Sequence, residues 1–285
     1  SSVSPILHFG LGTSTSVDSM VVRWPSGKMK SYYNIQANQR LYPDENDSEG
    51  ILNDQFEVEA YFTQEPCPID HQDIVNTSRD FDRQALLLKN YSRTGPCMKV
   101  ADLNGDGIID VIIGGSAGQL TKLYLGNAKG QYVLHHVPDF EKSKNSHDTS
   151  IEILDANGDG LLDIYIGSGG YHQFNLGDKD LIDRLYINQG NGTFKLTDLG
   201  WTSTTPTAVV KSFDINKDGF SDLIIGGGLL PGRWPEFAST HILVNNKKGK
   251  FIDETKKFSS EISNLGIVSD LAWSDLNGDG VMELI

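Results

Sequence analysis

The sequence is poor in cysteine and in basic residues. Its two cysteines, Cys67 and Cys97, are too few for a disulfide framework, and they form either one bridge in an oxidising compartment or two unrelated thiols. Only 24 basic side chains face 38 acidic ones, which leaves a net charge of −14 on 285 residues. A surplus of this sign argues against binding to nucleic acid or to anionic membrane surfaces.

The sequence also lacks a long apolar run. The longest stretch without charged or strongly polar residues, 223–231, is far shorter than the roughly 20 residues of a membrane-spanning helix, so we expect no membrane insertion. Residue 1 is Ser, and we therefore expect a piece of a longer chain, from whose first residues the localisation cannot be read. The 30 glycines are spread along the chain, which is typical of many short strands joined by turns.

An acidic segment of nine residues occurs four times, at residues 102–110, 155–163, 214–222 and 275–283. Each copy has Asp at position 1, Asn at position 3, Asp at position 5 and Gly at position 6. The first three copies run into a short stretch rich in β-branched residues and bounded by Gly, which predicts a buried strand.

The first three repeats share a second half as well. We expect third strands at residues 122–125, 184–187 and 241–244, each followed by a turn with a Gly two residues before an aromatic residue. One repeat is thus a four-stranded antiparallel blade with an acidic loop between its first two strands. Blades at this period predict an all-β fold, a β-propeller that is partial because the fourth repeat ends at Ile285.

The acidic loop has the donor set of a calcium site. Oxygen side chains stand at positions 1, 3, 5 and 9, and the apolar residue at position 7 can offer its backbone carbonyl, whereas no soft ligand for zinc or copper is present. Up to four Ca²⁺ ions would offset eight of the fourteen negative charges. The candidate ligands are Asp102, Asn104, Asp106, Ile108, Asp110; Asp155, Asn157, Asp159, Leu161, Asp163; Asp214, Asn216, Asp218, Phe220, Asp222; Asp275, Asn277, Asp279, Val281 and Glu283.

Two other interpretations compete with this site. An EF-hand needs a bidentate Glu at position 12, where this sequence has Ile113, Ile166 or Ile225, and it needs flanking helices instead of strands. A metal-free turn of solvated Asp and Asn side chains is the second alternative. Four copies in register favour the calcium site over such a turn.

The motif Asp-x-Asn-x-Asp-Gly-x-x-Asp, followed by an apolar strand and Gly-Gly, resembles the FG-GAP (VCBS-type) repeat over about residues 97–285. The resemblance implies a calcium-loaded hairpin loop in each blade and a secreted or cell-surface location. Glu283 departs from the motif but keeps an oxygen ligand.

Residues 8–12 (His-Phe-Gly-Leu-Gly), residues 21–27 (Val-Val-Arg-Trp-Pro-Ser-Gly) and Asn38-Gln39 are similar to the C-terminal part of the ASPIC/UnbV domain, which accompanies such repeats in cartilage acidic protein and bacterial surface proteins. We expect strands at 19–24 and 28–33 around a turn at 25–27. The expected organisation is an ASPIC/UnbV-like domain at 1–45, a linker at 46–60 and the propeller at 61–285.

The repeats differ mainly in the connection between their second and third strands. In an antiparallel blade these connections lie at the end opposite the acidic loops, and aromatic residues with an Arg on such loops suit a sugar or protein ligand. The alternative is that they pack the loops against the blades. The candidate ligand-face residues are Tyr171, His172, Phe174, Trp201, Arg233, Trp234 and Phe237.

We expect a non-enzymatic, calcium-binding adhesion or binding module whose partner is an extracellular glycan or protein. A carbohydrate-active propeller enzyme, such as a polysaccharide lyase or glycosidase, is an alternative for which Tyr171 and His172 are the only hints. A passive spacer in a larger surface protein is a third possibility. We expect no catalytic residue, because the Gly-x-Ser-x-Gly match at residues 114–118 precedes a strand where a nucleophile elbow needs a helix.

Overall fold

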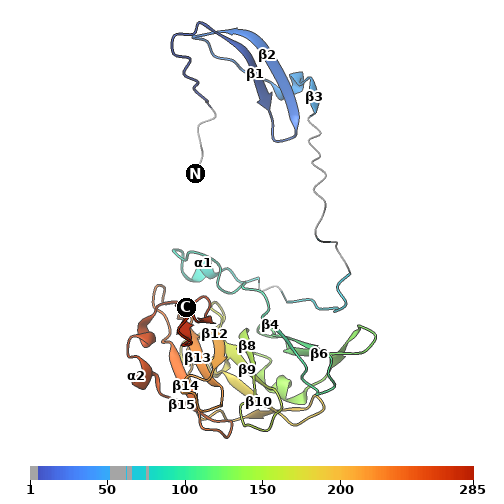
Figure 1. Cartoon of the computed structure of the whole chain (residues 1–285), viewed down its shortest axis with the longest axis vertical. Helices are drawn as coiled ribbons and strands as arrows, with labels where there is room; N and C mark the ends of the chain where they lie inside the picture. Colours follow the sequence, from blue (N-terminus) through green and yellow to red (C-terminus); the bar gives the residue numbers. More distant parts are fainter. Residues whose placement is uncertain (1–5, 52–61, 63–65, 75–76) are drawn as a thin grey trace. The chain divides into compact units, whose positions relative to one another are not determined.

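A computed structural model describes residues 6–51, 62, 66–74 and 77–285 (Figure 1). The chain divides into two compact units, Ser1–Glu65 and Pro66–Ile285. No helix in the part of the chain that the structure describes is long and apolar enough to cross a membrane.

The first unit contains a three-stranded antiparallel sheet of order β1-β2-β3, formed by β1 (Ser16–Arg23), β2 (Lys28–Gln36) and β3 (Gly50–Ile51). The predicted hairpin is confirmed, and a 3-10 helix, η1 (Glu45–Asp47), precedes β3. Because Gly50 and Ile51 pair with β2, the sheet extends into residues that were predicted as linker. The rest of that predicted linker, 52–60, lies outside the described residues.

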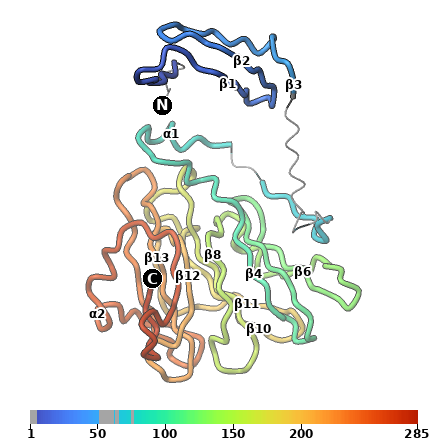
Figure 2. The backbone as a smooth tube through the Cα atoms, turned by 45° about the horizontal axis from the view of Figure 1, so that its top comes forward, coloured from blue at the N-terminus to red at the C-terminus, as the bar shows by residue number. Residues whose placement is uncertain are grey.

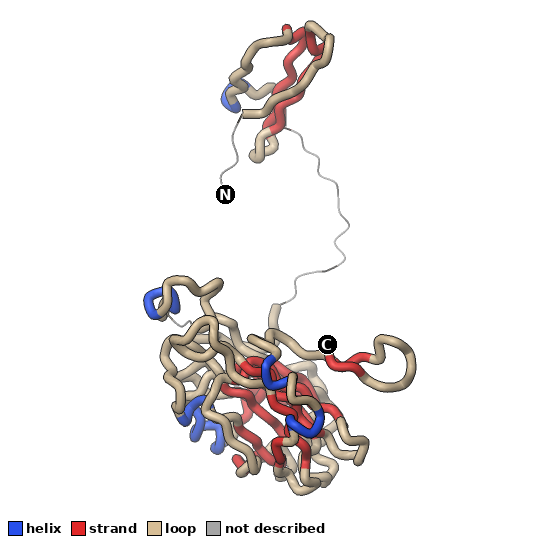
Figure 3. Tube along the Cα trace, turned by 90° about the vertical axis from the view of Figure 1, so that its left-hand side faces the viewer, coloured by secondary structure: helices blue, strands red, loops and turns tan. Residues whose placement is uncertain are grey.

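The second unit contains three four-stranded antiparallel sheets, one for each of the first three repeats, and a two-stranded pair from the fourth. Figure 3 shows its strands in red and its short helices in blue. The predicted all-β fold and blade composition are confirmed. The sheets consist of β4 (Met98–Ala101), β5 (Asp110–Ile113), β6 (Lys122–Gly126) and β7 (Tyr132–His135); β8 (Asp148–Leu154), β9 (Asp163–Ser168), β10 (Arg184–Asn188) and β11 (Phe194–Thr197); β12 (Thr207–Phe213), β13 (Asp222–Gly227), β14 (His241–Asn245) and β15 (Phe251–Asp253); and β16 (Trp273–Ser274) with β17 (Glu283–Leu284).

Helices in this unit are short and lie in the connections. They are α1 (Asp80–Arg83), η2 (Pro138–Ser143), η3 (Lys179–Leu181), α2 (Thr255–Phe258) and η4 (Ile262–Asn264).

The first strands of the three sheets, β4, β8 and β12, are neighbours in space, as the inner strands of propeller blades are (Figure 2). β8 contacts both β4 and β12, so the second sheet lies between the first and the third. The described sheets do not close into a barrel, which agrees with the predicted partial propeller.

Two apolar cores fill the spaces between neighbouring sheets. Ile164 on β9 packs into the core shared with the first sheet, while the next residue, Tyr165, packs into the core shared with the third. Successive side chains of a strand point to opposite faces, and here both faces are buried. This explains why the second strand of each repeat is a continuous apolar run and not an alternating one.

Close chain approaches account for the glycines that end these strands. A Cβ on Gly115 would lie 2.2 Å from the carbonyl oxygen of Gln119, and one on Gly227 would lie 1.9 Å from that of Ala238.

Both cysteines are free thiols, Cys67 exposed and Cys97 half-buried. Of the two alternatives for the cysteines, the structure therefore has two unrelated thiols and no bridge.

The core between the first two sheets should contribute strongly to the stability of the second unit. Ile164 is fully buried, and its truncation to Ala should lower the free energy of unfolding by about 2–5 kcal/mol through lost burial and the cavity that remains. Ile252, on β15, is 56% exposed, so Ile252→Ala is the matched control and should cost less than about 1 kcal/mol. Urea denaturation of both variants measures the difference, and equal costs would contradict this description of the core.

Candidate metal centre

The four acidic loops connect the first and second strands of their sheets and share one hydrogen-bond pattern. In the first loop Asp102 Oδ1 accepts from the N–H of Asp106 at 3.1 Å, and Asp102 Oδ2 accepts from the N–H of Gly107 at 2.8 Å. The same two bonds are made by Asp155, Asp214 and Asp275. Gly107 has φ +82°, a left-handed conformation that explains the Gly at position 6 of every copy.

Positions 3 and 5 form local turns within each loop. Asn104 Oδ1 accepts from the N–H of Asp106 at 2.9 Å, and Asp106 Oδ1 accepts from the N–H of Ile108 at 2.8 Å. The N–H of Gly107, with those of Gly105 and Asp106, lowers the pKa of Asp102, so this carboxylate is ionised at neutral pH. Asp102 Oδ1 also accepts from the N–H of Gly105 at 2.8 Å, so both of its lone pairs are used. Asp102 Oδ2, Asn104 Oδ1 and Asp106 Oδ1 each accept one of these bonds and keep a second lone pair that a cation can use.

Position 9 has a different role, because its carboxylate is buried. Asp163 is fully buried, and its oxygens accept from the N–H of Ala156 at 2.9 Å and of Asn188 at 2.7 Å. Asp110 and Asp222 make the equivalent bonds. Burial raises the pKa of Asp163 to about 6, although both N–H bonds oppose the rise. Position 9 therefore ties the loop to the third strand of its sheet, which the sequence interpretation as a simple ligand did not include.

The donor set fits calcium in chemistry, because it consists of carboxylate, amide and backbone oxygens. Among the described residues, no three His, Cys, Asp or Glu side chains converge closely enough to hold a metal by themselves. A calcium ion at one of these loops would therefore also need the Asn oxygen at position 3 and the carbonyl oxygen at position 7. In the fourth loop Glu283 Oε2 accepts from the N–H of Leu276 at 2.8 Å, so the longer side chain keeps the anchoring bond.

Two asparagines that sequence reasoning missed connect neighbouring loops. Asn188 Nδ2 donates to the carbonyl oxygen of Leu103 in the first loop at 2.9 Å and to that of Leu162 in the second at 3.0 Å. Asn245 Nδ2 likewise bonds the carbonyl oxygens of Ala156 and Ser221 in the second and third loops. Both residues end the third strand of a repeat, so aligning the repeats at that strand would have found them.

The predicted ligand face needs a correction. Tyr171 is 1% exposed and Phe174 is 4% exposed, so neither can present its ring to a ligand. Trp234 is half-buried and packs with Tyr171 and Leu229. Trp201 is half-buried too, with its ring centroid 5.1 Å from that of His241. These four aromatic residues therefore follow the alternative prediction, in which their side chains pack the loops against the blades.

Residues 79–92, which include α1, cover this aromatic cluster. Arg83 Nη1 donates to the carbonyl oxygens of Tyr171 at 2.7 Å, His172 at 2.9 Å and Phe174 at 2.6 Å. Gln84 Oε1 accepts from the hydroxyl of Tyr171 and from the N–H of Trp234. No local sequence pattern announced these contacts, because the partners are far apart in the chain.

Three candidates remain at the surface. Arg233 is about half exposed and pairs with Glu236 at 3.2 Å, and Phe237 is 36% exposed. His172 is partly exposed, with its Nδ1 3.9 Å from Asp80 Oδ1.

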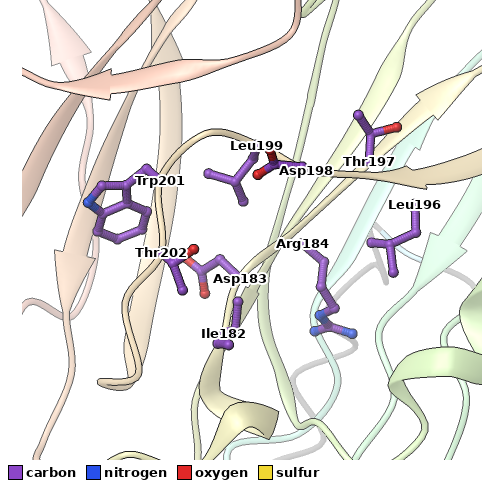
Figure 4. A pocket seen from close by; sticks show the side chains of 9 residues that line it. All are labelled: Ile182, Asp183, Arg184, Leu196, Thr197, Asp198, Leu199, Trp201 and Thr202. Carbon is purple, nitrogen blue, oxygen red and sulfur yellow. The ribbon is translucent and has the colours of Figure 1, made fainter.

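A cavity of about 280 Å³ lies beside β10 and the connection from β11 to β12 (Figure 4). Trp201 lines it, as do two buried charged residues, Asp183 and Arg184. Asp183 accepts from the hydroxyls of Tyr165 at 2.9 Å and Thr207 at 2.8 Å, and Arg184 Nη2 pairs with Asp148 at 2.6 Å. The bond to Thr207 on β12 joins the second and third sheets, whereas the bonds to Tyr165 on β9 and Asp148 on β8 lie within the second repeat.

The pKa of Asp183 gives a pH-dependent contribution to stability. Burial raises this pKa from 3.8 to about 6, so the folded state gains stability at low pH and loses it as the pH rises through about 6. In chelator, wild type should therefore lose stability relative to Asp183→Asn between about pH 4 and pH 7. Denaturant unfolding at several pH values measures this, and a difference that does not change with pH would contradict it.

Comparison with known families agrees with these two units. The model described as "ASPIC and UnbV" matches residues 1–50, and the model described as "FG-GAP-like repeat" matches residues 102–166, which include the first two acidic loops. The chain thus has an ASPIC/UnbV domain at residues 1–50 and an FG-GAP-like repeat at residues 102–166, and both resemblances that the motifs indicated are confirmed over these residues. A comparison with curated proteins found no match.

One solved structure similar to this chain concerns a lectin of Agrocybe aegerita and its specific recognition of non-reducing terminal N-acetylglucosamine. The identity is 19% and the TM-score 0.42, and the match covers 67% of this chain and 46% of the other. The chain spans less than half of that structure's length, and a likeness this low carries no inference about function.

Proposed function

We propose that this chain is a calcium-dependent β-propeller module that binds a partner outside the cell and catalyses no reaction. The observation that supports it most is the shared geometry of the four acidic loops, in which position 1 and position 6 make the same backbone bond in every copy. A turn ordered in this way holds carboxylate, amide and carbonyl oxygens within a few residues of one another, and oxygens of these kinds are the ligands that calcium prefers.

Calcium would stabilise the propeller through its loops. An ion that binds only the folded state adds RT ln(1 + [L]/Kd) to the free energy of unfolding. Extracellular calcium modules typically have dissociation constants of about 10⁻⁴ to 10⁻³ M, which is the range we propose here. Positions 1, 3 and 5 would supply side-chain oxygens and position 7 a carbonyl oxygen, while the buried carboxylate at position 9 holds the loop in place.

The partner we propose is an extracellular glycan or a protein, and the location is secreted or cell-surface. Arg233 and Phe237 are the exposed members of the candidate ligand face, at the strand ends opposite the acidic loops. An enzyme is less well supported, because the hydroxyl of Tyr171, one of its two hints, is bonded to Gln84 inside the packed cluster.

Asp159→Ala tests the calcium part of this proposal. The substitution removes the carboxylate at position 5 of the second loop, so it should lower the melting temperature by several degrees in millimolar Ca²⁺ and by much less in chelator. Glu261→Ala, an exposed carboxylate outside the loops, is the control and should behave alike in both conditions. Differential scanning calorimetry measures both, and equal destabilisation with and without Ca²⁺ would contradict calcium binding at this loop.

Binding of the full chain to a glycan array, in Ca²⁺ and in chelator, tests the partner. We expect binding that chelator abolishes and that Arg233→Ala weakens. Binding that is unchanged in chelator would contradict the calcium dependence.

A further inference from the structure

The third acidic loop differs from the other three in its charge. Its position 4 is Lys217, with φ +60°, where the other loops have Gly105, Gly158 and Gly278. A second lysine, Lys247, reaches the same loop from the turn between β14 and β15. The two ammonium groups reduce the formal charge of the loop's three carboxylates from −3 to −1.

The ammonium of Lys247 lies at the carboxylate of position 5. Its Nζ is 3.3 Å from Asp218 Oδ2 and lies over the Phe220 ring, 5.3 Å from the ring centre, so the ammonium contacts both position 5 and position 7 of the loop. In the other three loops the equivalent Oδ2 accepts from the amide of the Asn at position 3, at 3.0, 2.9 and 3.1 Å. The position-5 carboxylate is thus paired with a positive charge in the third loop and with a neutral amide in the other three.

The repeats can be aligned residue by residue at this turn. The N–H groups of Gly126, Asn188 and Asn245 each donate to the buried carboxylate at position 9 of their own loop. Lys247 follows Asn245 by two residues, so it corresponds to Ala128 and Gly190. Gly190 has φ +86° and Lys247 has φ +66°, so these two positions share the left-handed backbone.

We propose that the Lys247 ammonium occupies the cation position of the third loop, so that this loop binds calcium more weakly than the other three. The inference rests on the proposed calcium binding at the remaining loops. A divalent ion that binds Asp218 must displace the ammonium or lie close to it, and like charges repel at this distance. Calcium affinity in oxygen sites follows the charge of the ligand set, so we expect a difference of about tenfold or more.

The position-6 glycines provide one reporter for each loop. The N–H groups of Gly107, Gly160, Gly219 and Gly280 each donate to the position-1 carboxylate at 2.8 Å, so a cation at that carboxylate should shift their amide resonances. In a Ca²⁺ titration of the ¹⁵N-labelled full chain, we expect Gly107, Gly160 and Gly280 to shift with similar midpoints. Gly219 should shift at Ca²⁺ concentrations about tenfold higher.

Two substitutions test the cause in opposite directions. Lys247→Met keeps an unbranched side chain and removes the charge, so it should bring the Gly219 midpoint down towards the others. Gly190→Lys introduces the lysine into the second sheet and should raise the Gly160 midpoint. An added Cβ at Gly190 meets nothing within 4 Å, and the cost of this substitution is the strain of its φ of +86°, a left-handed conformation that Lys247 itself adopts. Lys248→Met changes the net charge equally and is the control, with no change expected at Gly219.

The outcomes separate this inference from the proposed function. If none of the four glycine amides shifts in millimolar Ca²⁺, the proposed calcium binding itself is wrong. If Gly107, Gly160 and Gly280 shift and Gly219 shifts with the same midpoint, calcium binding stands and the role of Lys247 is overturned. An unchanged Gly219 midpoint in Lys247→Met, with a higher midpoint in wild type than for the other loops, would also overturn it.

Discussion

One buried carboxylate in each of the first three repeats holds the acidic loop to the body of its sheet. Asp110, Asp163 and Asp222 have no exposed surface, and each accepts one N–H from the start of its loop and one from the end of the third strand. Burying a carboxylate is costly unless hydrogen bonds compensate it, and bonds to an ionised acceptor are about twice as strong as neutral ones. The anchor joins the start of the loop to the end of the third strand, while the bonds within the loop order the oxygens at positions 1, 3 and 5.

The anchored loops form a connected rim along one end of the three sheets. Asn188 and Asn245 bond carbonyl oxygens on both sides of each gap between sheets, and the N–H of Gly249 donates to the carbonyl oxygen of Ala156 at 3.1 Å. A cation that binds one loop would therefore bind a loop that is also hydrogen-bonded to the neighbouring sheet. Lys247 belongs to the same rim, which is why a side chain of the β14–β15 turn can reach the third loop.

The opposite end of the sheets is organised by apolar packing together with side-chain bonds to the backbone of the connections. Arg83 and Gln84 bond the backbone of the long connections at residues 170–177 and 229–237, and the rings of Tyr171 and Trp234 are enclosed beneath them. Aromatic residues on variable loops suggested a recognition surface, but such residues also bury large apolar areas. Here the rings of Tyr171 and Phe174 are buried, and the exposed candidates that remain are Arg233 and Phe237.

The sequence by itself determined the features that depend on local chemistry. Local spacing predicted four features: the repeat, the strands of each blade, the oxygen positions of the loops and the glycines of the turns. Each of them depends on residues that lie close together in the chain. Only the tertiary structure decided that position 9 is buried, that residues 46–51 include a strand, that residues 79–92 cover the aromatic cluster, and that Lys247 lies at Asp218. These features join segments distant in the chain, and the energy of such contacts comes from burial and charge pairing that no local pattern encodes.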